Sequence, residues 1–254
     1  MKSQKFSELA ERERERYNEG LQRDGYNKFF NHCRYFYIRR RNQLIKEMMQ
    51  YVQGKKVLEI GSSAWRSWLE NNSILPSSLT CINISEAELQ AGVDSAASSD
   101  NSPDFILMDA HDLQFEDGTF DFVYGDAILH HLNMVPALDE IFRVLKPNGK
   151  ILFVEPLDVN PAGKLVRYLT KKARTSDEQP LRLCDITEIK KRFETQFFYE
   201  ELLSVPCGVL SGMLFKNPSN SLMRFAFRVD QFLDRNFSWL RNWFRHALIS
   251  GTRR

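Results

Sequence analysis

The sequence lacks the signatures of several common chemistries. Its four cysteines (Cys33, Cys81, Cys184 and Cys207) lie far apart and form no CxxC pair, which argues against a disulfide framework and a zinc site and favours a reducing cytoplasm. No GxxxxGK[ST] segment is present, so a P-loop is excluded, and no GxSxG elbow exists. The net charge of +2 is too small to indicate nucleic-acid binding by itself.

Long hydrophobic runs are also missing. The longest apolar-leaning run, "SVPCGVLSGMLF" at 204–215, is too short to span a bilayer and contains proline and glycine. The first twenty residues are charged throughout and lack the apolar segment of a signal peptide. With 254 residues and a hydrophobic fraction of 43%, the chain can bury a substantial core. These properties predict a soluble, cytoplasmic protein.

Strand-like and helix-like patterns alternate from residue 56 onward. Short apolar segments typical of buried strands are "KVLEIG" (56–61), "LTCINI" (79–84), "DFILMDA" (104–110), "FDFVYGD" (120–126) and "KILFVEP" (150–156). Helical patterns such as "EAELQAGVDSAA" and "MVPALDEIFRVLKP" separate them, and "PNG" at 147–149 predicts a tight turn after the second of these. Such alternation is typical of a parallel sheet covered by helices on both faces.

Two further segments extend the predicted sheet. Residues 195–205 and the C-terminal "RHALISGTRR" have strand character, which gives a doubly wound α/β fold with a mostly parallel seven-stranded sheet. We therefore expect a helical N-terminal lid (1–53), an α/β core (54–205), a helical insertion over the substrate side (206–244) and a final core strand (245–254). The lid includes "ERERER", which is typical of a solvated helix face.

Ligands of such sheets bind beyond the carboxyl ends of the strands, so the strand-end residues are the candidates for a site. These are Gly61, Asn83, Asp109, Asp126 and Glu155. A dinucleotide site needs three glycines near its pyrophosphate, whereas this loop has one and then a bulky Trp65. A nucleoside without phosphates needs only one tight turn, a hydrogen-bonding group for its ribose and one for its base, and this set supplies them.

At these residues the sequence resembles the class I S-adenosylmethionine-dependent methyltransferases. The resemblance runs from Val57 to Pro156 and is carried by "VLEIGS", "INISEAEL", "MDAHDLQFEDGTFDFVYGDAILHHL" and "IFRVLKPNGKILFVEP". It implies a Rossmann-like methyltransferase fold and S-adenosylmethionine as cofactor, with S-adenosylhomocysteine as product. It also implies which residues contact the cofactor. The methionine portion would meet Glu59, Gly61, Ser62 and Ser63, the ribose would meet Asn83 and Ile84, and the adenine would meet Asp109 and Ala110.

Two features depart from the family pattern. Serine and tryptophan stand at Ser63 and Trp65, where the family has glycine, and Asn83 stands where an acidic residue is usual. A neutral amide forms weaker hydrogen bonds than a carboxylate, so cofactor affinity is expected to be lower. We expect Trp65 to point into the core beneath the first helix of the sheet, which leaves the cofactor pocket open.

Methyl transfer from a sulfonium requires mainly alignment of acceptor and methyl group, with a base only if the acceptor must lose a proton. The candidates for such a base are Asp126, His130 and His131. The two histidines are adjacent and are expected to point to different sides, and a packing or capping role is the alternative for each. No ligand spacing indicates a metal site.

The acceptor itself carries no recognisable code. The resemblance favours a small molecule, a sugar or a glycolipid. The alternatives are an RNA methyltransferase, or a non-catalytic scaffold protein whose cofactor pocket is spoiled by Trp65 and Asn83. Residues 222–244 form an amphipathic pattern that permits weak contact with an anionic membrane. Its predicted apolar stripe consists of Leu222, Phe225, Ala226, Val229, Leu233, Phe237 and Leu240.

Overall fold

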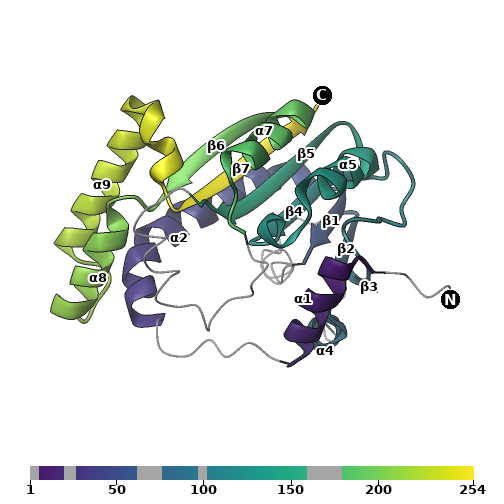
Figure 1. The fold of residues 1–254 in the computed structure, drawn as a ribbon, viewed down its shortest axis with the longest axis horizontal. Helices are drawn as coiled ribbons and strands as arrows, with labels where there is room; N and C mark the ends of the chain where they lie inside the picture. The colour runs from purple at the N-terminus through teal and green to yellow at the C-terminus, as the bar shows by residue number, and fades with distance from the viewer. Residues whose placement is uncertain (1–5, 20–26, 62–75, 97–101, 159–178) are drawn as a thin grey trace.

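The computed structural model describes residues 6–19, 27–61, 76–96, 102–158 and 179–254. Within these ranges the strands form one seven-stranded sheet in the order β3-β2-β1-β4-β5-β7-β6 (Figure 1). The first five strands are parallel, and β7 runs antiparallel to both β5 and β6. The strands are β1 (Lys56–Ile60), β2 (Ser78–Asn83), β3 (Asp104–Leu107), β4 (Phe120–Asp126), β5 (Leu145–Pro156), β6 (Phe193–Glu200) and β7 (His246–Arg253). The predicted fold class is confirmed.

Helices cover both faces of the sheet and extend beyond one of its ends. They are α1 (Glu8–Glu19), α2 (Asn27–Met49), α4 (Glu86–Ala96), α5 (Met134–Val144), α7 (Leu183–Arg192), α8 (Ser204–Leu214) and α9 (Ser221–Asn236), with short 3-10 turns η1 (Gln50–Val52), η2 (Leu129–His131) and η4 (Ser238–Trp243). In Figure 1, α8 and α9 lie outside α2 at the edge of the molecule, far from α5 and α7.

The alternation of side chains along each strand creates two cores. On β1, Leu58 faces the larger core, which includes residues of α5 and α7. Val57 faces the smaller core together with Phe122 of β4, and Leu44 and Ile45 of α2 pack against it. Both faces of the central strands are therefore covered by apolar residues, as a parallel sheet requires.

The boundaries of two strands differ from the predicted ones. β5 begins at Leu145, directly after α5, and its register with β4 jumps from Phe120–Leu145 to Phe122–Lys150. The predicted turn residues 147–149 lie in this jump, and Asn148 has a positive φ of 61°. β6 ends at Glu200 rather than at residue 205, because Ser204 already begins α8.

Candidate functional site

The strand-end residues predicted from the sequence lie along one edge of the sheet. β1, β2 and β3 are parallel and in register, with Ile60 opposite Ile82 and Asn83 opposite Leu107. The backbone links these ends, since the Gly61 N–H donates to Ile82 O at 2.8 Å and the Met108 N–H donates to Asn83 O at 3.0 Å. Gly61, Asn83 and the residues after β3 therefore stand at one level, beside the point where the strand order reverses.

Gly61 is required by its backbone and by its surroundings. Its φ of +65° is a left-handed conformation that side chains with a Cβ rarely adopt. A Cβ built there would stand 2.4 Å from Ile128 Cδ1 of the loop after β4. The strand thus turns sharply under a neighbouring loop. Ser62, Ser63 and Trp65 lie outside the described residues.

The side chains of Glu59 and Asn83 differ in their environment. Glu59 is fully buried on β1. Asn83 is half-buried and its Oδ1 accepts the Ser85 N–H at 2.9 Å, in a local turn that precedes α4. This carbonyl oxygen has a second acceptor position, and the amide N–H groups of Asn83 have no partner among the described residues. Ile84 beside it is half-buried.

Asp109 accepts hydrogen bonds at both of its carboxylate oxygens. Its Oδ2 accepts the N–H and the Oγ–H of Ser7, both at 3.0 Å. Its Oδ1 accepts the backbone N–H of His111 at 3.0 Å and faces His111 Nδ1 at 2.6 Å. Burial raises the pKa of Asp109, but the hydrogen bonds from His111 and Ser7 more than offset it and hold the pKa at about 2. Ala110, next to it, is buried.

His111 is fixed as a neutral tautomer by its two neighbours. The carboxylate of Asp109 can only accept, so Nδ1 carries the proton. Its Nε2 accepts the backbone N–H of Asn133 at 2.8 Å, which requires an unprotonated nitrogen. His111 therefore links the loop after β3 to the start of α5. In the described ranges, no three His, Cys, Asp or Glu side chains gather as metal ligands.

Glu155, near the end of β5, organises the loop after β4. Its carboxylate accepts the backbone N–H groups of Ile128, Leu129 and His130 at 2.9, 2.8 and 3.4 Å. The same carboxylate lies 2.8 Å from Nδ1 of His130. Nδ1 is therefore the donor, and Nε2 is the basic nitrogen of this buried imidazole. A carboxylate that orients an imidazole in this way is a common arrangement for a general base.

The two adjacent histidines do not point to different sides as predicted. Their rings lie 4.1 Å apart with an interplanar angle of 41°. They differ in their partners, because His131 Nδ1 faces Glu13 of α1 at 3.2 Å while His130 faces Glu155. The tight 3-10 turn η2, held by Glu155, brings both rings onto the same side.

Asp126, at the end of β4, is exposed to solvent. Burial is nevertheless the largest contribution to the raised pKa of this carboxyl, and Arg41 and Arg34 of α2 oppose it. The carboxyl of Asp126 thus meets solvent and is also close to charged groups of several elements. Glu155 and His130 act on Asp126 electrostatically, so Asp126 lies near the imidazole described above.

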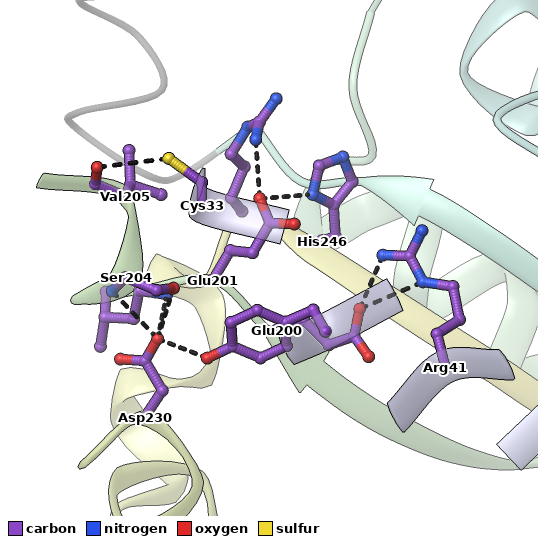
Figure 2. A network of polar contacts seen from close by, with 11 residues as sticks. Cys33, Arg41, Glu200, Glu201, Ser204, Val205, Asp230 and His246 are labelled. Carbon is purple, nitrogen blue, oxygen red and sulfur yellow. Dashed lines mark hydrogen bonds and ion pairs between the residues drawn. The ribbon is translucent and has the colours of Figure 1, made fainter. Parts of the chain in front are cut away.

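A buried polar network holds α2 against the end of the sheet (Figure 2). Arg41 of α2 donates two hydrogen bonds to Glu200 Oε2, at 3.2 and 2.6 Å. Tyr37, one turn earlier, donates to Asp230 of α9 at 2.5 Å. Arg245 at the start of β7 pairs with Glu201 at 2.6 Å. The network therefore joins α2, α9 and the ends of β6 and β7 near Asp126.

The N-terminal helix α1 lies across the strand ends. Ser7 bonds Asp109 after β3, Glu13 faces His131 after β4, and Arg14 pairs with Glu86 of α4 at 2.8 Å. The expectation that "ERERER" forms a solvated face is wrong for Glu13, which is buried. Sequence reasoning did not assign Ser7, Glu13 or Arg41 to the site. Their partners lie far away in the chain, and no local pattern could reveal them.

Comparisons with known proteins agree with this geometry. Residues 58–153 match the family model of a methyltransferase domain. The chain is 33% identical over 89 residues to the glycine/sarcosine/dimethylglycine N-methyltransferase of Actinopolyspora halophila, covering 34% of this chain and 16% of that protein. It is 32% identical over 118 residues to the demethylmenaquinone methyltransferase of Staphylococcus aureus (strain MRSA252), covering 45% of this chain and 48% of that protein. The chain therefore spans half or less of these curated relatives.

Solved structures show the same fold. The N-methyltransferase NodS from Bradyrhizobium japonicum WM9, in complex with S-adenosyl-L-homocysteine, superimposes with a TM-score of 0.54 at 13% identity, covering 85% of this chain and 86% of that one. Residues 58–153 therefore match a methyltransferase domain, and the sheet order and fold of the chain are similar to those of class I S-adenosylmethionine-dependent methyltransferases.

Proposed function

We propose that this protein transfers a methyl group from S-adenosylmethionine to a small-molecule, sugar or glycolipid acceptor. The observation that carries the proposal is the alignment of Gly61, Asn83 and Asp109 at one level of the carboxyl edge. Both sequence relatives described above are named as methyltransferases, and the similar solved structure holds S-adenosyl-L-homocysteine. An RNA acceptor is less well supported, because the N-terminal Arg14 and Arg41 are engaged in ion pairs.

The described residues fit a phosphate-free nucleoside. Gly61, with its positive φ and its close contact with Ile128, supplies the one tight turn that such a ligand needs. The Asn83 amide can donate to a ribose oxygen, and Asp109 can accept from the exocyclic amine of adenine beside the N–H of Ala110. Ile84 would contact the adenosine, and Glu59 and the serines Ser62 and Ser63 would stand near the methionine portion. The cofactor, when bound, supplies an activated methyl group.

The hydrogen bonds of Asp109 imply that the N-terminal helix and the cofactor compete. A carboxylate has about four acceptor positions, and Ser7 and His111 occupy four. The adenine amine can bond Asp109 only if a Ser7 donor withdraws. Cofactor entry would therefore be coupled to displacement of the start of α1, which acts as a lid over the adenine end.

The acceptor is proposed to bind beside Asp126 and η2. There His130, oriented by Glu155, would take a proton at Nε2 when the acceptor carries one on the attacking atom. His131 and Asp126 are further candidates for this role. Arg34 and Arg41 would balance the negative charge of Asp126. The remaining contribution of the protein is alignment, which can be worth about 7–11 kcal/mol.

Calorimetry with S-adenosylhomocysteine tests the cofactor site. Wild-type protein should bind it, and Asp109→Ala and Asn83→Ala should each weaken binding, the former by about tenfold or more because a charge-assisted hydrogen bond is lost. Asp121→Ala is the matched control, since Asp121 is a carboxylate bonded to Lys56 and Lys146 away from this edge. Absence of binding to the wild type at millimolar ligand would favour a scaffold protein instead.

A second experiment addresses the proposed base. With an identified acceptor, His130→Gln and Glu155→Gln should both lower kcat with little change in the affinity for S-adenosylhomocysteine. Glu155→Gln should in addition shift the pH profile, because it removes the charge that orients and stabilises the protonated imidazole. Equal kcat values for His130→Gln and wild type at all pH values would show that His130 is not the base and that the site only aligns the acceptor with the methyl group.

A further inference from the structure

Helix α8 has an unusual distribution of side chains. Residues Ser204–Leu214 include no charged residue. Apart from Val205, its buried residues are glycines and serines: Ser204, Gly208, Ser211 and Gly212. Its larger side chains face solvent: Val209, Leu210, Met213 and Leu214 are all exposed, Met213 to 72%. A helix on the surface of a globular protein normally turns its apolar side chains inward, so α8 is inverted.

The packing of α8 explains why the inversion is fixed. Gly208 lies directly on α2, where a Cβ would stand 2.2 Å from Cys33 Sγ. Ser211 Oγ bonds His32 of α2 at 2.8 Å and accepts from Asn220 Nδ2 at 2.7 Å. Rotating the helix to bury its leucines would break these hydrogen bonds and bring side chains against α2. The apolar face is therefore held toward solvent.

Helix α9 adds aromatic and basic side chains. The predicted stripe placed Phe225 on the buried side, but Phe225 is 61% exposed, and Met223, Ala226 and Asp230 are the buried residues. The prediction was wrong because Asp230 anchors the helix. Its carboxylate accepts hydrogen bonds from Tyr37 and from the backbone and hydroxyl of Ser204 (Figure 2). This rotates Phe225 and Phe232 outward.

The exposed face of α8, α9 and η4 is termed the hairpin surface. Its apolar members are Val209, Leu210, Met213, Leu214, Phe215, Phe225, Phe232, Phe237, Trp239 and Trp243. They are ten of the 14 exposed large hydrophobic residues in the part of the chain that the structure describes. α8 and α9 pack on α2 and on each other, and η4 packs on α9, so these exposed side chains lie on neighbouring elements. A group of exposed apolar side chains of this kind marks an interaction surface.

The charge of the hairpin surface indicates its partner. Lys216, Arg224, Arg228 and Arg235 are exposed, and none of them pairs with a carboxylate of the described residues. The nearby Arg241 is neutralised by Asp234 at 3.1 Å. An interface with a second copy of this chain would bring these cations together, which is unfavourable. Aromatic and aliphatic side chains beside unpaired arginines match an anionic lipid surface.

We propose that the hairpin surface docks on membranes containing anionic lipids, with its apolar side chains inserted among the headgroups. None of the described helices is long and apolar enough to cross a bilayer, so the surface would lie on the membrane. The network around Asp230 and Arg41 joins this surface to the elements beside Asp126, so docking would place Asp126 near the lipid. Binding requires neither cofactor nor methyl transfer, so it can be tested even if the proposed function fails.

The test is vesicle flotation of the full-length protein. Vesicles of phosphatidylcholine mixed with phosphatidylglycerol should carry the protein, those of phosphatidylcholine alone should carry far less, and added salt should release it. Each basic residue near an anionic surface strengthens binding about fivefold, so Arg224→Gln/Arg228→Gln should weaken it about thirtyfold. Met213→Ser/Leu214→Ser should weaken it by at least about tenfold.

Matched control variants distinguish the effect of changing the hairpin surface from the effect of removing charge or apolar area anywhere on the protein. Lys46→Gln/Lys190→Gln removes the same charge from exposed positions elsewhere, and Leu183→Ser removes a 52% exposed leucine from α7. Both controls should bind vesicles like the wild type. Absence of vesicle binding by the wild type, or equal losses in the controls, would overturn the proposal. The proposal would also be overturned if the wild type does not bind vesicles but forms a dimer, and if Met213→Ser/Leu214→Ser dissociates that dimer. The hairpin surface would then serve self-association.

Discussion

Replacing Ser7 by alanine should release α1 from the strand ends while the sheet stays folded. The Ser7 hydroxyl makes two hydrogen bonds, donating to Asp109 Oδ2 at 3.0 Å and accepting the Ala10 N–H at 3.2 Å as a helix N-cap does. An N-cap is worth about 1 kcal/mol, and a hydrogen bond to a carboxylate adds about 1.5 kcal/mol where it is partly solvated. Since these losses overlap, we expect about 2 kcal/mol in total.

Amide hydrogen exchange measures this loss directly. About 2 kcal/mol corresponds to a roughly thirtyfold loss of protection for the amides of residues 8–19, with β5 and β7 unchanged because they share no contact with Ser7. Thr187→Ala is the control, since this hydroxyl bonds only within α7, to Leu183 O at 2.9 Å. Unchanged protection of α1 in Ser7→Ala would show that Asp109 does not hold the helix.

Ser7→Ala also shows whether Ser7 competes with the cofactor for Asp109 or whether α1 closes over a bound cofactor. If the adenine amine and Ser7 share Asp109, Ser7→Ala frees an acceptor position and should tighten S-adenosylhomocysteine binding by a few-fold. If α1 instead closes over a cofactor that Asp109 already holds, the same substitution should weaken binding. Weaker binding by calorimetry would therefore refute the competition proposed above, even if the exchange result holds.

Three further results are expected. Asp230→Ala should lower the free energy of unfolding in urea by about 3 kcal/mol or more, since five hydrogen bonds to a buried carboxylate are lost, and Asp230→Asn by less. Burial lowers the pKa of His246 to about 3 although Glu201 opposes this. Folding therefore loses stability as pH falls from about 6.5 toward 3, by about 1 kcal/mol at pH 5.5, and His246→Asn should flatten that dependence. Gly61→Ala should destabilise the protein and weaken S-adenosylhomocysteine binding. Adding Ile128→Ala to this variant should restore only part of the stability, because the positive φ of residue 61 remains. Full restoration would show that only the contact between the new Cβ and Ile128 matters.

Several features of the site could be predicted from local sequence patterns. Gly61, Asn83 and Asp109 follow apolar segments that can only be buried strands, and parallel strands bring their carboxyl ends to one edge. The order of these residues along the edge then follows from the order of the strands. The hydrogen-bond partners of these residues could not be predicted from the sequence. Ser7, for example, is 102 residues from Asp109, and no repeat or spacing connects the two.

The N-terminal and C-terminal helices likewise have features that local sequence patterns predict and others that depend on distant residues. Alternation and helical spacing by themselves determined the sheet, the positions of most helices and the edge where the proposed site lies. Each of these depends on side chains a few residues apart. Only the tertiary structure decided that Glu13 is buried against His131, that Glu155 orients His130 and that Asp230 turns Phe225 to solvent. A buried charge goes where a distant partner can satisfy it, and that requirement overrides the local amphipathic pattern.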